Sequence, residues 1–181
     1  AQRVRRYRLR FDDNDAMSAE YQGAFGDTHA DTALRVVESI AGDAAGDRLL
    51  IADEDQRHLS TLREYTLDGR YTGRRVPDRS FQAQAEGVAL WSCGAGDGYW
   101  IAVDQLMPRT IFHVYDRDSL EPRGSFSGEV TAHTDGIALH AAGTSAFPTG
   151  ALYAVHDDRS VTAFDLGDVA RALQLQSSCL N

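Results

Sequence analysis

Lysine is absent from the sequence, so all of its positive side-chain charge comes from arginine. The formal net charge over the 181 residues is −9. We therefore expect no nucleic-acid partner, because binding to the phosphate backbone depends on a basic surface. A cation, or an anion bridged by cations, is compatible with this charge. Arginine is also the better planar clamp for phosphate or carboxylate, although genome base composition can produce the same bias.

Cysteine is nearly absent as well, with only Cys93 and Cys179 in the chain. They do not form a Cys-x-x-Cys pair, which disfavours a zinc site. One disulfide in an exported protein and two free thiols are both compatible with this pair. No apolar run approaches the roughly 20 residues that a membrane-spanning helix requires, so we expect no membrane partner.

The sequence does contain a repeat with a period of about 50 residues. Its three copies begin at Val37, Ala85 and Thr134. Each copy opens on an acid, a small residue and an aliphatic residue, and continues through a glycine-containing turn into a second apolar strand. An alternating third strand follows, and the first two copies add a fourth, which Asp68-Gly69 introduces in the first copy as a tight turn.

Four strands per unit at this period are typical of the blades of a β-propeller. The segment "VRRYRLRF" followed by "AEYQGAF" predicts two further outer strands, and "GDVARALQL" predicts a short C-terminal helix capped by Asp168. We expect an all-β propeller of four-stranded antiparallel blades, about three and a half in number. The expected division is a half blade at 1–27, blades at 28–78 and 79–129, and a last blade with the helix at 130–181.

Propellers close with at least about four blades, and an open arc leaves sheet edges and faces exposed. We therefore expect the missing blades to come from the rest of a longer precursor or from another chain.

Acidic residues recur at equivalent positions of the repeat. Glu38, Glu86 and Asp135 open the three copies, and polar residues end each second strand. We align these strand ends as two further sets: Glu54 with Asp104 and His156, and Asp55 with Gln105 and Asp157. In a propeller the first strand of each blade borders a central channel. Antiparallel pairing then brings all three sets to one mouth of this channel, where their oxygen atoms suit calcium. The alternative for each acid is that it caps a turn through backbone N–H groups.

Six motifs carry a resemblance to a known family: "VESIAGDAAGDRLLIADED", "AEGVAL", "GYWIAVDQ", "FHVYDR", "HTDGIAL" and "YAVHDD". In this order they resemble the last three blades of the β-propeller phytases, calcium-dependent enzymes that hydrolyse inositol hexakisphosphate. The resemblance implies a six-bladed ring, a secreted or periplasmic location, an inositol phosphate substrate, and calcium ions that bridge carboxylates to phosphates and activate a water.

The resemblance and the repeat together give the expected site. Glu38, Glu86 and Asp135 are the expected catalytic residues. The expected calcium ligands are Glu38, Glu54, Asp55, Glu86, Asp104, Gln105, Asp135 and Asp157. Arginines that follow the second strands could clamp a phosphate, or could be solvated loop residues: Arg57, Arg109 and Arg159.

Three features depart from the family pattern. Gln84 stands where the family often has an acid, and Ser39 replaces a glycine. The basic residues that clamp phosphate in the family lie largely on earlier blades, which this sequence does not contain. Two other functions therefore stay open: a non-catalytic binding propeller stabilised by calcium, and a lactonase-like propeller with one metal on its axis.

Overall fold

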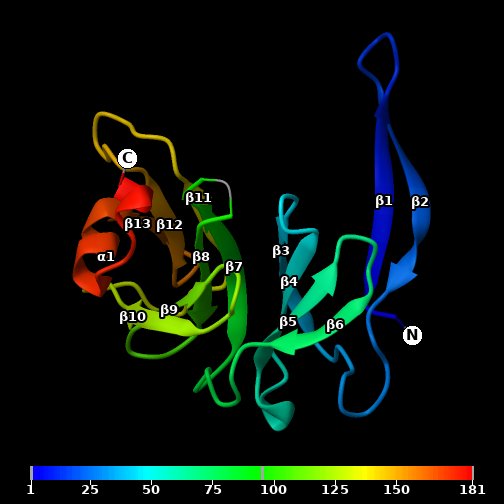
Figure 1. Ribbon diagram of the computed structural model, residues 1–181, viewed down its shortest axis with the longest axis horizontal. Coiled ribbons are helices and arrows are strands. Elements are labelled where there is room, and N and C mark those ends of the chain that lie inside the picture. The colour runs from blue at the N-terminus through cyan, green and yellow to red at the C-terminus, as the bar shows by residue number, and fades with distance from the viewer. Residues whose placement is uncertain (1, 95, 181) are drawn as a thin grey trace.

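A computed structural model describes residues 2–94 and 96–180 of the chain. These residues form four separate antiparallel β-sheets followed by one short C-terminal α-helix (Figure 1). The all-β class and the C-terminal helix that the sequence predicts are therefore confirmed. No helix in the described ranges combines the length and the apolar character that crossing a membrane requires.

The first sheet is a two-stranded ribbon of β1 (Val4–Phe11) and β2 (Met17–Phe25). Its base packs against the next sheet, because Val4 and Phe25 join a small core with Ile51 and Tyr65. Beyond this base the ribbon extends past the end of its neighbour (Figure 1). Most of its apolar side chains are consequently exposed.

The next two sheets each have four strands in sequential order, as the repeat predicts. One contains β3 (Val37–Asp43), β4 (Arg48–Asp53), β5 (Thr61–Thr66) and β6 (Tyr71–Arg75). The other contains β7 (Ala85–Ser92), β8 (Gly98–Asp104), β9 (Ile111–Asp116) and β10 (Pro122–Phe126). Gly69 has a φ of 93° in the turn between β5 and β6, a conformation that favours glycine.

The last sheet contains β11 (Ile137–His140), β12 (Ala151–His156) and β13 (Ser160–Asp165). Helix α1 (Leu166–Leu173) follows without a loop. Asp165 caps it, because its side chain accepts a hydrogen bond from the backbone N–H of Asp168. The predicted cap, Asp168, is therefore wrong: the helix starts directly at the end of β13, which places Asp168 inside its first turn.

The three larger sheets pack face to face through alternating side chains of their middle strands. On β8, Trp100 and Ala102 belong to the core shared with the β3–β6 sheet. Ile101 and Val103, which point the other way, belong to the core shared with the last sheet and α1. The first strands adjoin one another as well, β3 beside β7 and β7 beside β11.

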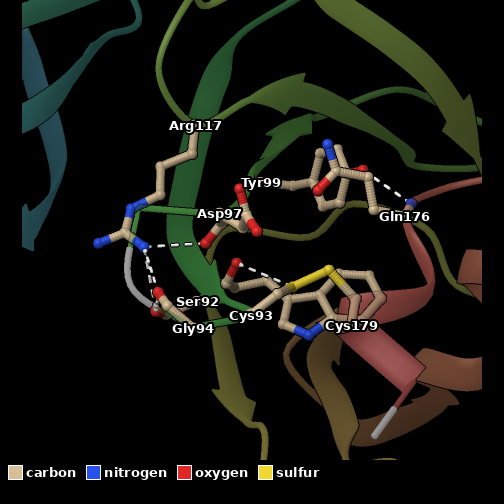
Figure 2. The surroundings of a disulfide bond; sticks show 9 residues. Ser92, Cys93, Gly94, Asp97, Tyr99, Arg117, Gln176 and Cys179 are labelled. Carbon is tan, nitrogen blue, oxygen red and sulfur yellow. Dashed lines mark hydrogen bonds between the residues drawn. A yellow bond between two sulfur atoms is a disulfide. The ribbon is translucent and has the colours of Figure 1, made fainter.

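A disulfide joins Cys93, just after β7, to Cys179 in the short helix η2 (Ser177–Leu180) (Figure 2). The backbone N–H of Gln176 donates to the Tyr99 hydroxyl over 3.0 Å beside it. These two links hold the segment after α1 against the β7–β10 sheet. The sequence left open whether the two cysteines bond, and the structure pairs them.

Removing this disulfide is expected to destabilise the fold. The bond closes a loop with a sequence separation of 86 residues, and cross-links of such length stabilise proteins by about 2–5 kcal/mol. The variant Cys93→Ser/Cys179→Ser should lose that much unfolding free energy in urea titrations. Reductant should destabilise the unsubstituted protein equally and leave the double variant unchanged. Equal stability of the oxidised protein and the double variant would contradict the expectation.

Candidate functional site

Three glutamates from two adjacent sheets form a cluster at one end of the strands. Glu38 lies on β3, Glu54 directly follows β4, and Glu86 lies on β7. One carboxylate oxygen of each lies within 4.8 Å of those of the other two. The register of β3 against β4 shifts beside Glu38, and that of β7 against β8 shifts beside Glu86. Such irregularities re-aim side chains, which is how bulges commonly serve functional sites.

Asp135 joins the cluster from the segment before β11. A cavity of about 190 Å³ is lined by Glu38, Ser39 and Gly87 together with Asp135 and the two residues after it. The backbone N–H of Gly87 donates to the Asp135 carbonyl over 2.8 Å. A Cβ at position 87 would lie 2.9 Å from that carbonyl oxygen, so this close approach of the two sheets requires glycine.

Side-chain amides orient two of the acids. Gln84 donates from Nε2 to Glu54, and Gln105 donates from Nε2 to Asp135. An amide that donates to a carboxylate oxygen fixes the direction of that carboxylate. In two sheets the residue after the second strand makes a hydrogen bond to the acid at the start of the next sheet. Glu54 bonds to Glu86, and Gln105 bonds to Asp135.

The carboxyl group of Glu86 is the most perturbed acid of the cluster. Its residue is 3% exposed. Burial raises the pKa of Glu86 from 4.5 to about 8, helped by its hydrogen bond to Glu54 and by the negative charges of Glu38, Glu54 and Asp135. In the metal-free protein these effects favour the protonated form of Glu86, whose O–H donates a hydrogen bond to the Glu54 carboxylate. A carboxyl group whose pKa is raised in this way lacks a nearby positive charge that would stabilise its ionised form.

Asp104, an expected ligand, is committed to the backbone. It is fully buried and accepts hydrogen bonds from the N–H groups of Gln82 and Ala83 over 2.8 and 2.9 Å. Asp53 does the same for Arg35 and Val36 over 3.0 Å. Both acids thus accept hydrogen bonds from the segment that leads into the first strand of their own sheet.

The sequence alignment of the second strands is therefore wrong by one position in the first copy, whereas the second and third copies are aligned correctly. In the last sheet His156 accepts from a backbone N–H in the same way as Asp53 and Asp104, so these three residues are equivalent. Glu54, Gln105 and Asp157 form the next set, because each donates its backbone N–H to the segment before its own sheet's first strand. The acidic run after β4 offers several registers, and only the hydrogen-bond pattern selects one.

Asp55 caps the short helix η1 (Gln56–His58). Its carboxylate accepts from the backbone and side chain of Arg57 and contacts His58 Nδ1 over 3.0 Å. The hydrogen bond from Arg57, ahead of that from His58, lowers the pKa of Asp55 to about 2. Asp55 is thus occupied by its own loop and is not among the clustered acids.

The three arginines that were expected to clamp phosphate differ in their ion pairs. Arg57 pairs with Asp55, and Arg159 pairs with Asp157 over 3.2 Å. Arg109 is exposed, and no ion pair of its side chain occurs within residues 2–94 and 96–180. The structure does not bring these arginines to the Glu38–Glu54–Glu86 cluster.

Two residues that depart from the family pattern prove to be part of the site. Gln84 contacts Glu54, and Ser39 accepts a hydrogen bond from the Val88 N–H over 3.1 Å, which links β3 to β7. In the sequence, both residues are visible only as departures from the expected motifs. Their position next to the repeating acids was the available signal.

The donor set is chemically suited to a hard cation. Glu38, Glu54, Glu86 and Asp135 offer carboxylate oxygens from three sheets, which is the ligand type that calcium prefers. Neither cysteine belongs to the cluster, since both are in the disulfide. A hard cation such as calcium, magnesium or manganese therefore fits these residues better than zinc or copper does.

A scan against protein-family models found no match to this chain, and a search of curated proteins found none either.

Proposed function

We propose that this chain is part of a β-propeller that hydrolyses phosphate monoesters with the help of calcium, and that inositol hexakisphosphate is its substrate. The observation that carries the proposal is the convergence of acids from three successive sheets around the buried carboxyl group of Glu86. The six motifs that resemble the β-propeller phytases supply the substrate and the reaction.

The packing supports the propeller. Successive sheets lie face to face, and their first strands adjoin in the order β3, β7, β11. We propose blades at 28–78, 79–129 and 130–181 and a half blade at 1–27, with the remainder of a six-bladed ring supplied by the rest of a precursor or by another chain. The disulfide favours a secreted or periplasmic location, because disulfides persist in oxidising compartments.

The acids and amides of the site have separate tasks in this proposal. Glu38, Glu86 and Asp135 bind the reactive cation with Glu54, and Gln84 and Gln105 hold two of these carboxylates in direction. Bound calcium would neutralise phosphate oxygens and activate a water. Asp157, the remaining expected ligand, pairs with Arg159. In this proposal it faces the blade that follows the last sheet in the ring.

One observation favours a second candidate, a binding propeller that uses calcium for stability alone. Arg57 and Arg159 are paired with their own loop aspartates, so neither is free to clamp phosphate. This candidate requires calcium binding without turnover.

Calcium binding by the chain tests the site directly. Titration calorimetry should detect binding that a chelator reverses, and Asp135→Asn should weaken it about tenfold or more, because ligand charge sets affinity. Asp31→Asn, at an exposed position outside the cluster, should leave it unchanged. Phosphate release from phytate by a form that contains the remaining blades then separates the two candidates. Turnover that survives chelation would reject the metal mechanism.

A further inference from the structure

Two buried hydroxyl groups stand at equivalent positions of the repeat. Ser60 directly precedes β5, whose first residue pairs with Asp53 at the end of β4. Thr110 directly precedes β9, whose first residue pairs with Asp104 at the end of β8. Both hydroxyl residues are buried. Because a buried hydroxyl is costly unless it is hydrogen-bonded, its partners indicate what it does.

The Ser60 hydroxyl bridges the two chain segments that carry Glu54 and Glu86. It accepts a hydrogen bond from the backbone N–H of Ala85 over 2.7 Å and donates to the carbonyl of Asp53 over 3.2 Å. Ala85 directly precedes Glu86 in the chain. Asp53 directly precedes Glu54. Since the side chains of Glu54 and Glu86 hydrogen-bond to each other, one hydroxyl group holds both backbones at the separation that this contact needs.

Thr110 holds the segment before Asp135 in a similar way. Its Oγ1 accepts from the backbone N–H of Thr134 over 3.2 Å and donates to the Thr134 hydroxyl over 2.9 Å. Thr134 is fully buried and directly precedes Asp135. The Asp135 carbonyl in turn accepts the N–H of Gly87 over 2.8 Å. The segment that Thr110 holds is therefore joined to the segment that Ser60 holds.

We infer that Ser60 and Thr110 are positioning residues, whose hydroxyl groups fix the separation of the clustered acids and thereby set their affinity for a cation. Residues that orient metal ligands without touching the metal commonly change metal affinity by about 10- to 100-fold when they are replaced. The inference rests on the cation site of the proposed function and is independent of phosphate hydrolysis.

Calcium titration of the full chain tests the inference, with the metal alone as the probe. Ser60→Ala removes the bridge and should weaken calcium binding about tenfold or more. Thr110→Val should weaken it similarly, and because valine keeps the shape of threonine, this variant provides the test even where Ser60→Ala does not fold. Ser60→Thr and Thr110→Ser keep the hydroxyl group and should restore binding, since the repeat uses both residue types at this position.

Thr162→Val is the matched control. It breaks the hydroxyl pair of Thr131 and Thr162, which has the same 2.9 Å length as the pair that Thr110 makes. Thr162 lies on β13, which carries none of the clustered acids, so this change should lower stability without changing calcium binding. Equal weakening of calcium binding by Thr162→Val and Thr110→Val would overturn the inference, because general destabilisation would then be the cause. Calcium binding that neither Ser60→Ala nor Thr110→Val weakens would also overturn it.

Hydrogen exchange in the presence of a chelator provides a readout that needs no bound cation. The Gly87 amide reports on both held segments, because it follows the one that Ser60 holds and donates to the Asp135 carbonyl. Its exchange, relative to that of Ile101 on the inner strand β8, should accelerate in Ser60→Ala and Thr110→Val but not in the control. If the unsubstituted chain binds no calcium, the proposed function fails and this exchange decides the inference alone. Unchanged relative exchange of Gly87 would then overturn it.

Discussion

Replacing Glu86 by glutamine is expected to stabilise the metal-free protein at alkaline pH and to abolish calcium binding. The pKa of Glu86 is raised from 4.5 to about 8 in the folded state, chiefly by burial. Between these values the folded state holds a proton that the unfolded state has released. The stability that this proton confers is complete below pH 4.5 and is lost as the pH rises through about 8.

Glutamine imitates the protonated acid, because its amide can donate to Glu54 at every pH. At pH 9 the metal-free Glu86→Gln variant should therefore gain at least about 1.4 kcal/mol, the equivalent of one pKa unit. Urea titrations from pH 5 to pH 9 with a chelator measure this gain, and calorimetry measures the loss of calcium binding. Glu121→Gln, an exposed position outside the cluster, should show neither effect. If the unfolding free energy of Glu86→Gln depends on pH as that of the unsubstituted protein does, the raised pKa belongs to another group.

Replacing Arg117 by methionine is expected to cost about 3–5 kcal/mol of unfolding free energy. Arg117 follows β9 and is buried, and its Nε and Nη2 donate to both oxygens of Asp43 over 2.9 and 2.6 Å. Its Nη1 donates to the carbonyls of Gly94 and Asp97 and to the Ser92 hydroxyl (Figure 2). The guanidinium thus joins two sheets, and its hydrogen bonds lower the pKa of Asp43 to about 2. Methionine fills similar space but leaves a buried carboxylate with less compensation.

Arg123→Met is the matched control. Arg123 pairs with Asp116 over 2.8 Å, but its side chain is half exposed, and exposed pairs contribute less than about 1 kcal/mol. Thermal and urea unfolding of both variants provide the comparison. The change Asp43→Asn in the Arg117→Met background should recover part of the loss, because it removes the uncompensated charge. Equal losses from the two arginine variants would show that burial does not strengthen the Asp43 pair.

Much of the fold follows from the sequence, because local patterns encode it. The repeat and the Asp68-Gly69 turn predict the four-stranded sheets, since alternation and turn chemistry act over a few residues. The pair of Asp43 and Arg117 could not be predicted, because the two residues are 74 positions apart with no pattern that links them. The Cys93–Cys179 bond is similarly distant and stayed one of two alternatives.

The candidate site was predictable in part. Equivalent repeat positions led to Glu38, Glu86 and Asp135. Glu38 and Asp135 line one cavity, and both lie close enough to Glu86 for their charges to raise its pKa. Asp55 and Asp104 were expected beside them but serve as caps, because a carboxylate can satisfy nearby N–H groups as readily as it binds an ion. Residue type alone does not distinguish these two uses, whereas the direction of the backbone N–H groups does.

The covalent bond between Cys93 and Cys179 also changes how the molecule bears mechanical load. Tension applied between the two termini passes from Cys179 directly into Cys93. The part of the chain from β8 to α1 therefore carries none of it. Only the portion before Cys93 can lengthen, by roughly 3.3–3.6 Å for each residue pulled straight. A single protease cut inside the bypassed portion would leave both fragments tethered.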